Sequence, residues 1–417
     1  MIKTMKQALY FPIAYYFRFW AQIQLFLWKP KIIVITGSSG KTTLLHLIES
    51  QIGEKAKYSH HANSSYGIPF DILGLSRKRL TPDEWIYLFF LAPIKAFKSK
   101  PLKKLYVAEA DCDRPGEGKF LASLLNPEIT LWINSSLTHS VNFDSEVENK
   151  HFSSAEEAIA YEFGHFLKYT QKLSIVNGDN PLIQKQLGRT KNPVEIVTKK
   201  DLGSYEINEN STEFIIEDKK YSINFLVPKD VSYSIQMVNL LMKNLNLPFD
   251  PTFKNLTLPP GRNSILKGIK NTTIVDSTYN TTPDGIKAIL QMLDKYPSKN
   301  KWIVLGDMIE LGKEEKKEHE ELANILNSMD VLKIILIGPR VSKYTYPKLQ
   351  KKSNRFQIPK DGKDFIMKNI NGDETILFKG ARFLEGIIEC LLQDKKDIDK
   401  LVRREKVWQN RRKSFGL

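Results

Sequence analysis

Cysteine is scarce in this 417-residue sequence, in which Cys112 and Cys390 are the two cysteines. Two isolated cysteines make neither a disulfide framework nor the spacing of a metal site, so a reducing cytoplasm fits best. No internal repeat or low-complexity tract stands out, which argues against a repeat architecture. The hydrophobic share of 41% is ordinary for a folded chain with room for two or three domains.

A cleavable signal peptide is also missing, because no small-residue cleavage site follows the apolar stretch at residues 8–28. That stretch is long enough to span a membrane. Tyr15, Arg18 and Gln22, however, give its helix a polar stripe, so a span is the less favoured reading. Two readings stay open: residues 1–30 form a helix that lies on a membrane surface, or a helix that packs on the protein's own sheet.

Negative charge is in deficit, with 47 Asp and Glu against 62 Lys and Arg and a net charge of +15. This balance favours anionic partners such as nucleotides, a phospholipid surface or nucleic acid. A generally basic proteome would explain it equally well.

The clearest motif follows an apolar run at residues 31–36, which predicts a buried strand. A turn of small residues then lets backbone N–H groups face an anion: Gly37, Ser38, Ser39 and Gly40. Lys41 adds a charge for the outer phosphates, Thr42 offers a hydroxyl to Mg²⁺, and Thr43 continues into a predicted helix. The pattern predicts a nucleotide-binding loop for ATP or GTP. A turn that merely caps a helix would leave Lys41 unexplained.

Apolar runs alternate with helical patterns from the first strand to about Pro248, including runs at 104–110, 129–135 and 173–179. Such alternation predicts an α/β fold with a mostly parallel sheet covered by helices. Residues 205–227 instead alternate with a short period, which predicts antiparallel hairpin strands. The Pro- and Asn-rich stretch 247–263 is the best linker candidate.

Beyond the linker the alternation restarts, with apolar runs at 272–277, 301–307, 333–339 and 375–381. These runs predict a second, Rossmann-like α/β domain. We therefore expect four segments: a helical segment at 1–30, a nucleotide-binding domain at 31–248, an α/β domain at 249–393 and a basic tail at 394–417. The tail reads either as a helix docked on the last domain or as one that touches a membrane or nucleic acid.

Two further side chains follow predicted strands of the first sheet. Glu109 ends one strand and His139 follows the next. Because the carboxyl ends of parallel strands share one edge, both are candidates to hold a nucleotide-bound metal ion. Taken singly, a solvated glutamate and a capping histidine are the simpler readings.

Nine segments in register resemble the Mur ligase family of ATP-dependent amide ligases: TGSSGKTT (36–43), NSSYGIP (63–69), AEA with RPGE (108–117), NPEITLWINSSLTH (126–139), NGDNP (177–181), GRN (261–263), IVDSTYNTTP (274–283), VLGDMIELG (304–312) and LFKGAR (377–382). The resemblance implies that a peptide carboxylate attacks the γ-phosphate of ATP and that the amine of an amino acid or dipeptide then displaces phosphate from the acyl phosphate. ATP and Mg²⁺ are the implied cofactors, and we do not expect nucleic acid as a partner.

The resemblance also implies roles for individual residues. Lys41 and the loop hold the phosphates, while Thr42, Glu109 and His139 hold metal ions. Asn63 lies near the reacting carboxylate and Asn177 beside the adenine. Arg262 and Asp276 come from the second domain to meet phosphate and ribose. For Lys379 a strand-end structural role and a contact with the acceptor both stay open.

Three departures from the family pattern bear on the substrate and the metal. About thirty residues precede the first strand, fewer than the family's UDP-binding domain needs, so we expect a lipid-linked or other acid as the alternative substrate. Phe163 stands where the family has a carbamylated lysine ligand, which weakens the second metal site. PKDVSYS (228–234) replaces the family's G-x-H-x-x-x-N segment. Together they keep a defunct nucleotide-binding homologue as a further alternative.

Overall fold

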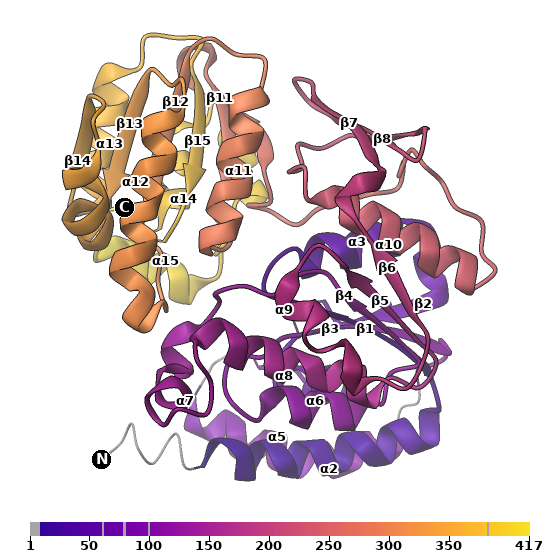
Figure 1. Cartoon of the computed structure of the whole chain (residues 1–417). Helices are drawn as coiled ribbons and strands as arrows, with labels where there is room; N and C mark the ends of the chain where they lie inside the picture. The colour runs from indigo at the N-terminus through magenta and orange to yellow at the C-terminus, as the bar shows by residue number, and fades with distance from the viewer. Residues whose placement is uncertain (1–8, 61, 78–80, 99–100, 382) are drawn as a thin grey trace. The chain divides into compact units, whose positions relative to one another are not determined.

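The computed structural model describes residues 9–60, 62–77, 81–98, 101–381 and 383–417 (Figure 1). The chain forms two compact units. The first comprises the residues up to Ser136 together with Ser145–Lys199 and Tyr233–Phe249. The second comprises Leu137–Asp144, Lys200–Ser232 and Asp250–Leu417. The predicted limits at 30, 248 and 393 stay predictions for the domains.

The first unit is built on a six-stranded parallel sheet, as predicted. Its strand order is β2-β3-β1-β4-β5-β6, with β1 (Lys31–Thr36), β2 (Ala56–Tyr58), β3 (Leu105–Ala110), β4 (Ile129–Trp132), β5 (Leu173–Asn177) and β6 (Val194–Val197). The central strands are apolar because both faces of the sheet are covered, and every residue of β4 and β5 is buried. The carboxyl ends of β1 and β3 lie side by side, since Ile35 pairs with Glu109 in register.

The helices of this unit are α2 (Tyr10–Trp28), α3 (Lys41–Ile52), α4 (Gly67–Leu73), α5 (Pro82–Lys98), α6 (Glu117–Leu125), α8 (Ala155–Tyr169), α9 (Pro181–Gln184) and α10 (Val231–Asn244), whose first two residues belong to the second unit. The short α7 (Asp144–Glu148) also begins at a unit boundary. Polar side chains cap the N-termini of two of these helices. At the start of α8 the Ser154 hydroxyl accepts a hydrogen bond from the Glu157 N–H. Asn180 caps α9 in the same way.

The polar stripe predicted for α2 is exposed at Tyr15 and Gln22 but not at Arg18. Arg18 is buried, and its guanidinium donates to the carbonyl of Phe120 and to the hydroxyl of Ser123 at 3.1 Å. Gln24 is buried as well. The helix thus packs on the protein itself, as one of the two open readings expected. Among the described residues, no helix has the length and apolarity needed to cross a membrane.

The second unit contains two sheets. The larger has the order β10-β11-β15-β12-β13-β14, with β10 (Ser264–Lys267), β11 (Thr273–Ser277), β12 (Lys301–Gly306), β13 (Lys333–Ile337), β14 (Ser353–Phe356) and β15 (Thr375–Lys379). All its neighbours pair in parallel except β10, which is antiparallel to β11. The smaller sheet is the predicted antiparallel set, β7 (Leu202–Ile207), β8 (Thr212–Ile216) and β9 (Lys219–Ile223).

The α-helices that lie wholly among the described residues of the second unit are α11 (Pro283–Lys295), α12 (Glu315–Ser328), α13 (Pro359–Asn369), α14 (Leu384–Leu391) and α15 (Lys406–Lys413). The basic tail packs on this unit, because Leu401 joins the apolar core beside Leu384 and Leu391. Arg412 is buried, and its guanidinium lies 3.8 Å from the carboxylate of Glu385 on α14. The structure therefore supports the prediction that the tail docks on the last domain.

Candidate nucleotide-binding site

The loop between β1 and α3 has the backbone of a phosphate cradle. Gly37 and Gly40 have φ angles of 134° and 82°, values that side chains other than glycine rarely adopt. At Gly37 space is also short, because a Cβ atom would lie 2.7 Å from the carbonyl oxygen of Asn134. The positive φ of Gly40 directly precedes α3, so the N-terminus of that helix faces the loop.

The segment after β4 holds this loop in place. The Ser38 hydroxyl donates to the carbonyl of Ser136 and accepts from its N–H, both at 2.8 Å. The amide side chain of Asn134 accepts from the Ser39 N–H at 3.0 Å and donates to the Ser39 hydroxyl at 2.6 Å. Sequence reasoning did not assign Asn134. Its place near the end of the predicted run at 129–135 was the available signal.

Lys41 is the charged centre of the loop. Its ammonium donates to the carbonyl of Gly37 at 2.5 Å and pairs with the carboxylate of Asp111 at 2.7 Å. Burial lowers the pKa of Lys41, but Asp111 and Glu109 outweigh that effect and raise the pKa above its ordinary value. The lysine therefore carries a full positive charge in a dry environment, where it attracts an anion most strongly. Asp111 was not predicted as part of the site.

Thr42 and Glu109 meet as predicted. The Thr42 hydroxyl lies 3.0 and 3.2 Å from the two carboxylate oxygens of Glu109. A hydroxyl and a carboxylate are the hard oxygen donors that Mg²⁺ prefers, so this pair fits a nucleotide-bound magnesium ion. Thr43 follows in the first turn of α3.

The loop that carries Asn63 is attached to the same edge of the sheet. The N–H of Asp111 donates to the carbonyl of Asn63 at 2.8 Å. Nearby, the buried carboxylate of Glu117 accepts from the N–H and hydroxyl of Ser65 at 2.7 and 2.6 Å. Asn63 is thereby held beside Asp111, the partner of Lys41. Its predicted role near a substrate carboxylate stays a prediction.

Asn177 and Phe163 have structural contacts. The Asn177 side chain donates to the carbonyl of Ile133 at 3.0 Å and accepts from the N–H of Asp179, so it links β4 to β5. Its place beside an adenine stays a prediction. Phe163 is fully buried in α8, with its ring 6.2 Å from that of Trp132. The phenyl ring packs in the core and has no atom that can bind a metal ion.

His139 belongs to the second unit. It has a φ angle of 49°, and its Nδ1 lies 2.5 Å from a carboxylate oxygen of Glu310. The hydrogen bond with His139 lowers the pKa of Glu310. Glu310 lies within the VLGDMIELG segment, from which no role was predicted for it. The assignment of His139 as a metal ligand stays a prediction.

A charged cluster lies at the carboxyl ends of β11 and β15. The Oδ1 atom of buried Asp276 accepts from the hydroxyl and N–H of Thr278, at 2.6 and 3.0 Å, while its Oδ2 atom accepts no hydrogen bond from the described residues. Burial raises the pKa of Asp276. The Arg262 guanidinium stacks 4.3 Å from the ring centre of Tyr279.

Lys379 lies in the same cluster and is also fully buried. Its ammonium donates to the carbonyls of Asn280 at 2.7 Å and Ser277 at 3.4 Å. Burial first and the neighbouring charge of Arg262 second lower its pKa to about 7, while Asp276 acts in the opposite direction. The charges of Arg262 and Asp276 thus act on Lys379 within one unit. The sequence prediction took Arg262 and Asp276 together and weighed Lys379 apart from them.

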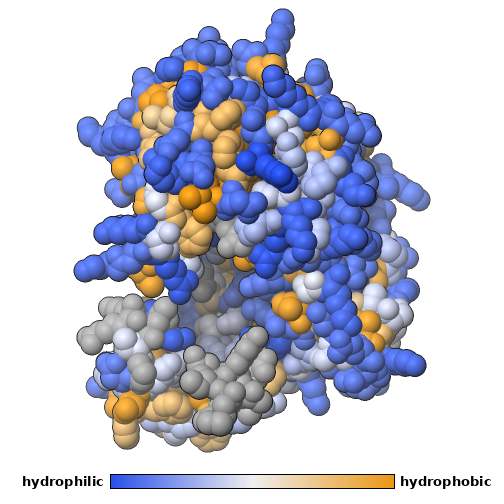
Figure 2. All heavy atoms as spheres, turned by 90° about the vertical axis from the view of Figure 1, so that its left-hand side faces the viewer, coloured by the Kyte–Doolittle hydropathy of each residue, from blue (hydrophilic) through white to orange (hydrophobic). Residues whose placement is uncertain are grey.

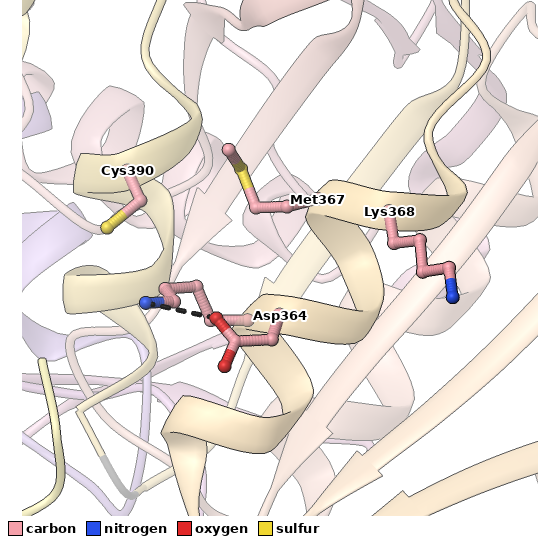
Figure 3. A pocket seen from close by; sticks show the side chains of 5 residues that line it. Asp364, Met367, Lys368 and Cys390 are labelled. Carbon is pink, nitrogen blue, oxygen red and sulfur yellow. Dashed lines mark ion pairs between the residues drawn. The ribbon is translucent and has the colours of Figure 1, made fainter.

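A surface pocket of the second unit lies between α13 and α14 (Figure 3). Its lining residues are Lys363, Asp364, Met367, Lys368 and Cys390. Lys363 and Asp364 pair with each other at 3.2 Å. None of the predicted site residues lines this pocket, so it does not bear on the nucleotide site.

Comparison with known families agrees with this geometry. The Mur ligase middle domain matches residues 35–241, and the Mur ligase, glutamate ligase domain matches residues 261–382. The chain belongs to the Mur ligase family, whose members are ATP-dependent ligases. The predicted resemblance and the predicted α/β fold class are both confirmed.

The chain is also similar to individual proteins of this family. The UDP-N-acetylmuramoyl-tripeptide–D-alanyl-D-alanine ligase of Rickettsia prowazekii is 24% identical over 377 residues, covering 85% of this chain and 76% of the relative. The ligase of the same name from Bacillus subtilis is 22% identical, covering 87% and 76%. Among solved structures, MurF ligase from Thermotoga maritima in complex with ADP has a TM-score of 0.70 at 21% identity, covering 95% of this chain and 84% of that one.

Proposed function

We propose that this enzyme uses ATP to join the peptide carboxylate of a cell-wall precursor to the amine of D-alanyl-D-alanine or a similar dipeptide. The observation that carries the proposal is the phosphate loop, with buried Lys41 between Gly37 and Asp111 and with Thr42 against Glu109. The names of the relatives support the choice of substrates. We take residues 31–248 as the central domain and 249–393 as the C-terminal domain.

The proposed chemistry has two displacements. An oxygen of the substrate carboxylate attacks the γ-phosphorus of ATP, the bond to the β-phosphate oxygen breaks, and ADP leaves. The amine of the second substrate then attacks the acyl carbon, the carbon–oxygen bond breaks, phosphate leaves and the nitrogen loses a proton. Neither displacement needs a covalent bond to the protein, so the protein acts by positioning both substrates and by stabilising charge on the transferring phosphoryl group.

Within the first unit each residue has a distinct task. The Lys41 ammonium binds the outer phosphates, and the loop amides bind the phosphate oxygens that face the N-terminus of α3. Thr42 and Glu109 would hold Mg²⁺, which when bound neutralises phosphate charge. Asp111 keeps Lys41 protonated and oriented. Asn63, held beside Asp111, would meet the carboxylate that is to be phosphorylated.

In the second unit, His139 and the coupled cluster of Arg262, Asp276 and Lys379 are the remaining candidates. Arg262 would contact phosphate and Asp276 the ribose hydroxyls. The Oδ2 atom of Asp276 accepts no hydrogen bond from the described residues. Because a buried carboxylate oxygen without a donor is costly, this supports the binding of a polar ligand at Asp276. Lys379, with a pKa of about 7, is neutral or charged according to what binds beside it.

A lipid-linked acid is the second candidate substrate. The exposed apolar surface of α2 and α5 favours it, because this surface would bring the enzyme to a membrane where such an acid resides. The reaction and its residues are the same for both candidates, and only the carrier of the carboxylate differs.

The test is an assay of ADP release over pairs of acids and amines. We expect release to require ATP, Mg²⁺, UDP-N-acetylmuramoyl-tripeptide and D-alanyl-D-alanine together. Turnover with lipid-linked acids alone would favour the second candidate. Nucleotide binding without turnover on any pair would refute the proposal and indicate a defunct homologue.

Lys41→Met should abolish turnover because it removes the phosphate-binding charge. Lys57→Met is the matched control, since Lys57 forms another lysine–aspartate pair of the same unit, with Asp71 at 2.6 Å. We expect this control to keep most of the turnover. Equal activity of Lys41→Met and the parent enzyme would exclude the proposed use of the loop.

A further inference from the structure

Helix α5 exposes one continuous apolar stripe. Ile86, Tyr87, Phe90, Ile94 and Phe97 are each more than half exposed, and Phe90 reaches 73%. They recur at helical spacing over three turns, so they share one face. The opposite face is apolar too, because Leu88, Ala92 and Ala96 are buried in the protein. Among the described residues, nothing covers the exposed face, so α5 is apolar on both faces over its central turns but is buried on one of them alone.

Helix α2 extends this surface. Tyr15 and Phe19 are each 54% exposed, and Phe26 is 72% exposed. The two helices pack together, since the Tyr16 hydroxyl donates to the carbonyl of Phe89 at 2.7 Å. Figure 1 shows them in one layer at the lower edge of the first unit, and Figure 2 shows apolar side chains along the same lower edge. We call the eight exposed residues of α5 and α2 the α2–α5 surface.

The sequence around this surface is strongly basic. Among the residues that the structure describes, Lys29 at the end of α2 and Lys98 at the end of α5 are exposed, as are Lys103 and Lys104 shortly after α5. The acidic residues of α5 are confined to its first turn, at Asp83 and Glu84. Some of these cations adjoin the apolar side chains directly, as Lys29 does over the ring of Phe26 at 5.6 Å. A second copy of the chain would bring like charges together on such a surface. An anionic phospholipid surface has both the complementary charge and an apolar interior.

We propose that the α2–α5 surface binds peripherally to anionic phospholipid bilayers. The exposed Phe and Ile side chains enter the boundary between headgroups and acyl chains, and the tyrosines stay at headgroup level. The surrounding lysines and arginines bind the lipid phosphates. The helices lie on the bilayer, in agreement with the finding that no described helix is long and apolar enough to span it.

The membrane contact favours the lipid-linked candidate substrate, but it is tested separately from the ligase activity. Vesicle binding is measured without nucleotide or substrate, so failure of one proposal does not imply failure of the other. If both hold, the membrane contact places the active enzyme where lipid-linked intermediates are made or used.

The experiment is co-sedimentation of the full chain with sucrose-loaded vesicles. We expect binding to vesicles of mixed phosphatidylglycerol and phosphatidylcholine, weaker binding to phosphatidylcholine alone, and a decrease of binding with salt. The test variant combines Ile86→Gln, Phe90→Gln and Ile94→Gln. Because these side chains are already exposed, the fold should persist, while the partition coefficient should fall at least about tenfold.

The matched control replaces three exposed apolar residues of the second unit, Ile215, Leu332 and Val407, by glutamine. This control should bind vesicles as the parent does, and all three proteins should have the same circular dichroism spectrum. Absence of vesicle binding by the parent would overturn the proposal, as would equal binding of the two triple variants. A dimer in vesicle-free solution that the test variant dissociates, with no vesicle binding, would instead assign the surface to a second copy.

Discussion

Lys379 offers a sharp test of the electrostatics of the second unit. Its side chain is buried at the end of β15, and burial together with the charge of Arg262 lowers its pKa from 10.5 to about 7. The difference corresponds to roughly 5 kcal/mol, since each pKa unit is worth about 1.4 kcal/mol. Below pH 7 Lys379 is charged in both folded and unfolded chains, so the full cost applies. Between pH 7 and 10.5 the unfolded chain binds more protons, so this contribution to stability rises with pH until the cost disappears.

The substitution Lys379→Met removes that cost together with two hydrogen bonds, to Asn280 and Ser277, each worth about 1 kcal/mol. We therefore expect the variant to be more stable than the parent by about 2 to 4 kcal/mol at pH 6. Near pH 10.5 the advantage should vanish or reverse by about 1 to 2 kcal/mol.

The assay is urea unfolding of both proteins at pH 6, 7.5, 9 and 10.5, followed by circular dichroism. Lys267→Met is the control, because Lys267 is an exposed lysine of the same sheet, on β10. Its stability difference from the parent should stay constant with pH. A constant difference for Lys379→Met as well, or a loss of stability at pH 6, would refute the reasoning about the buried ammonium.

Three further substitutions test the first unit. Gly37→Ala should weaken binding of a fluorescent ATP analogue at least about tenfold, because its Cβ atom would lie 2.7 Å from the Asn134 carbonyl oxygen at a φ angle of 134°; unchanged affinity would contradict the cradle. Glu109→Gln should raise the Mg²⁺ concentration needed for half-maximal ADP release, and an unshifted Mg²⁺ titration would remove Glu109 from the metal site. Gly118→Ala should destabilise the protein by about 2 kcal/mol or more in urea, since its Cβ atom would lie 2.1 Å from the carbonyl oxygen of Glu162; a silent substitution would contradict the close packing of α6 on α8.

The central strands could be predicted because each is a buried apolar run with helical segments on either side. The strands β2, β6, β10 and β14 were not singled out. They have three or four residues each, and all four lie at sheet edges, where many of their side chains are partly exposed. Their pairing depends on the neighbouring strand more than on their own composition. Nothing in three residues such as Ala56–Tyr58 distinguishes a strand from a loop.

Some residues of the site could likewise be predicted from the sequence and others could not. Lys41, Thr42 and Glu109 could be predicted because their chemistry has a fixed spacing from a glycine turn and a strand end. Asp111 and Asn134 could not, since their roles depend on which strands become neighbours. The burial of Arg18 in α2 could not be predicted either, because its guanidinium donates to a carbonyl oxygen on α6, far away in the sequence.

The most direct test of the proposed reaction follows the oxygen of the substrate carboxylate. With the acceptor carboxylate labelled by ¹⁸O, the reaction should transfer one labelled oxygen to each inorganic phosphate released, as measured by mass spectrometry, because that oxygen attacks the γ-phosphorus and then departs with it. The transfer should require both the amine substrate and Lys41. Unlabelled phosphate released during amide formation would show that water or another nucleophile attacks ATP, and would contradict the acyl-phosphate route.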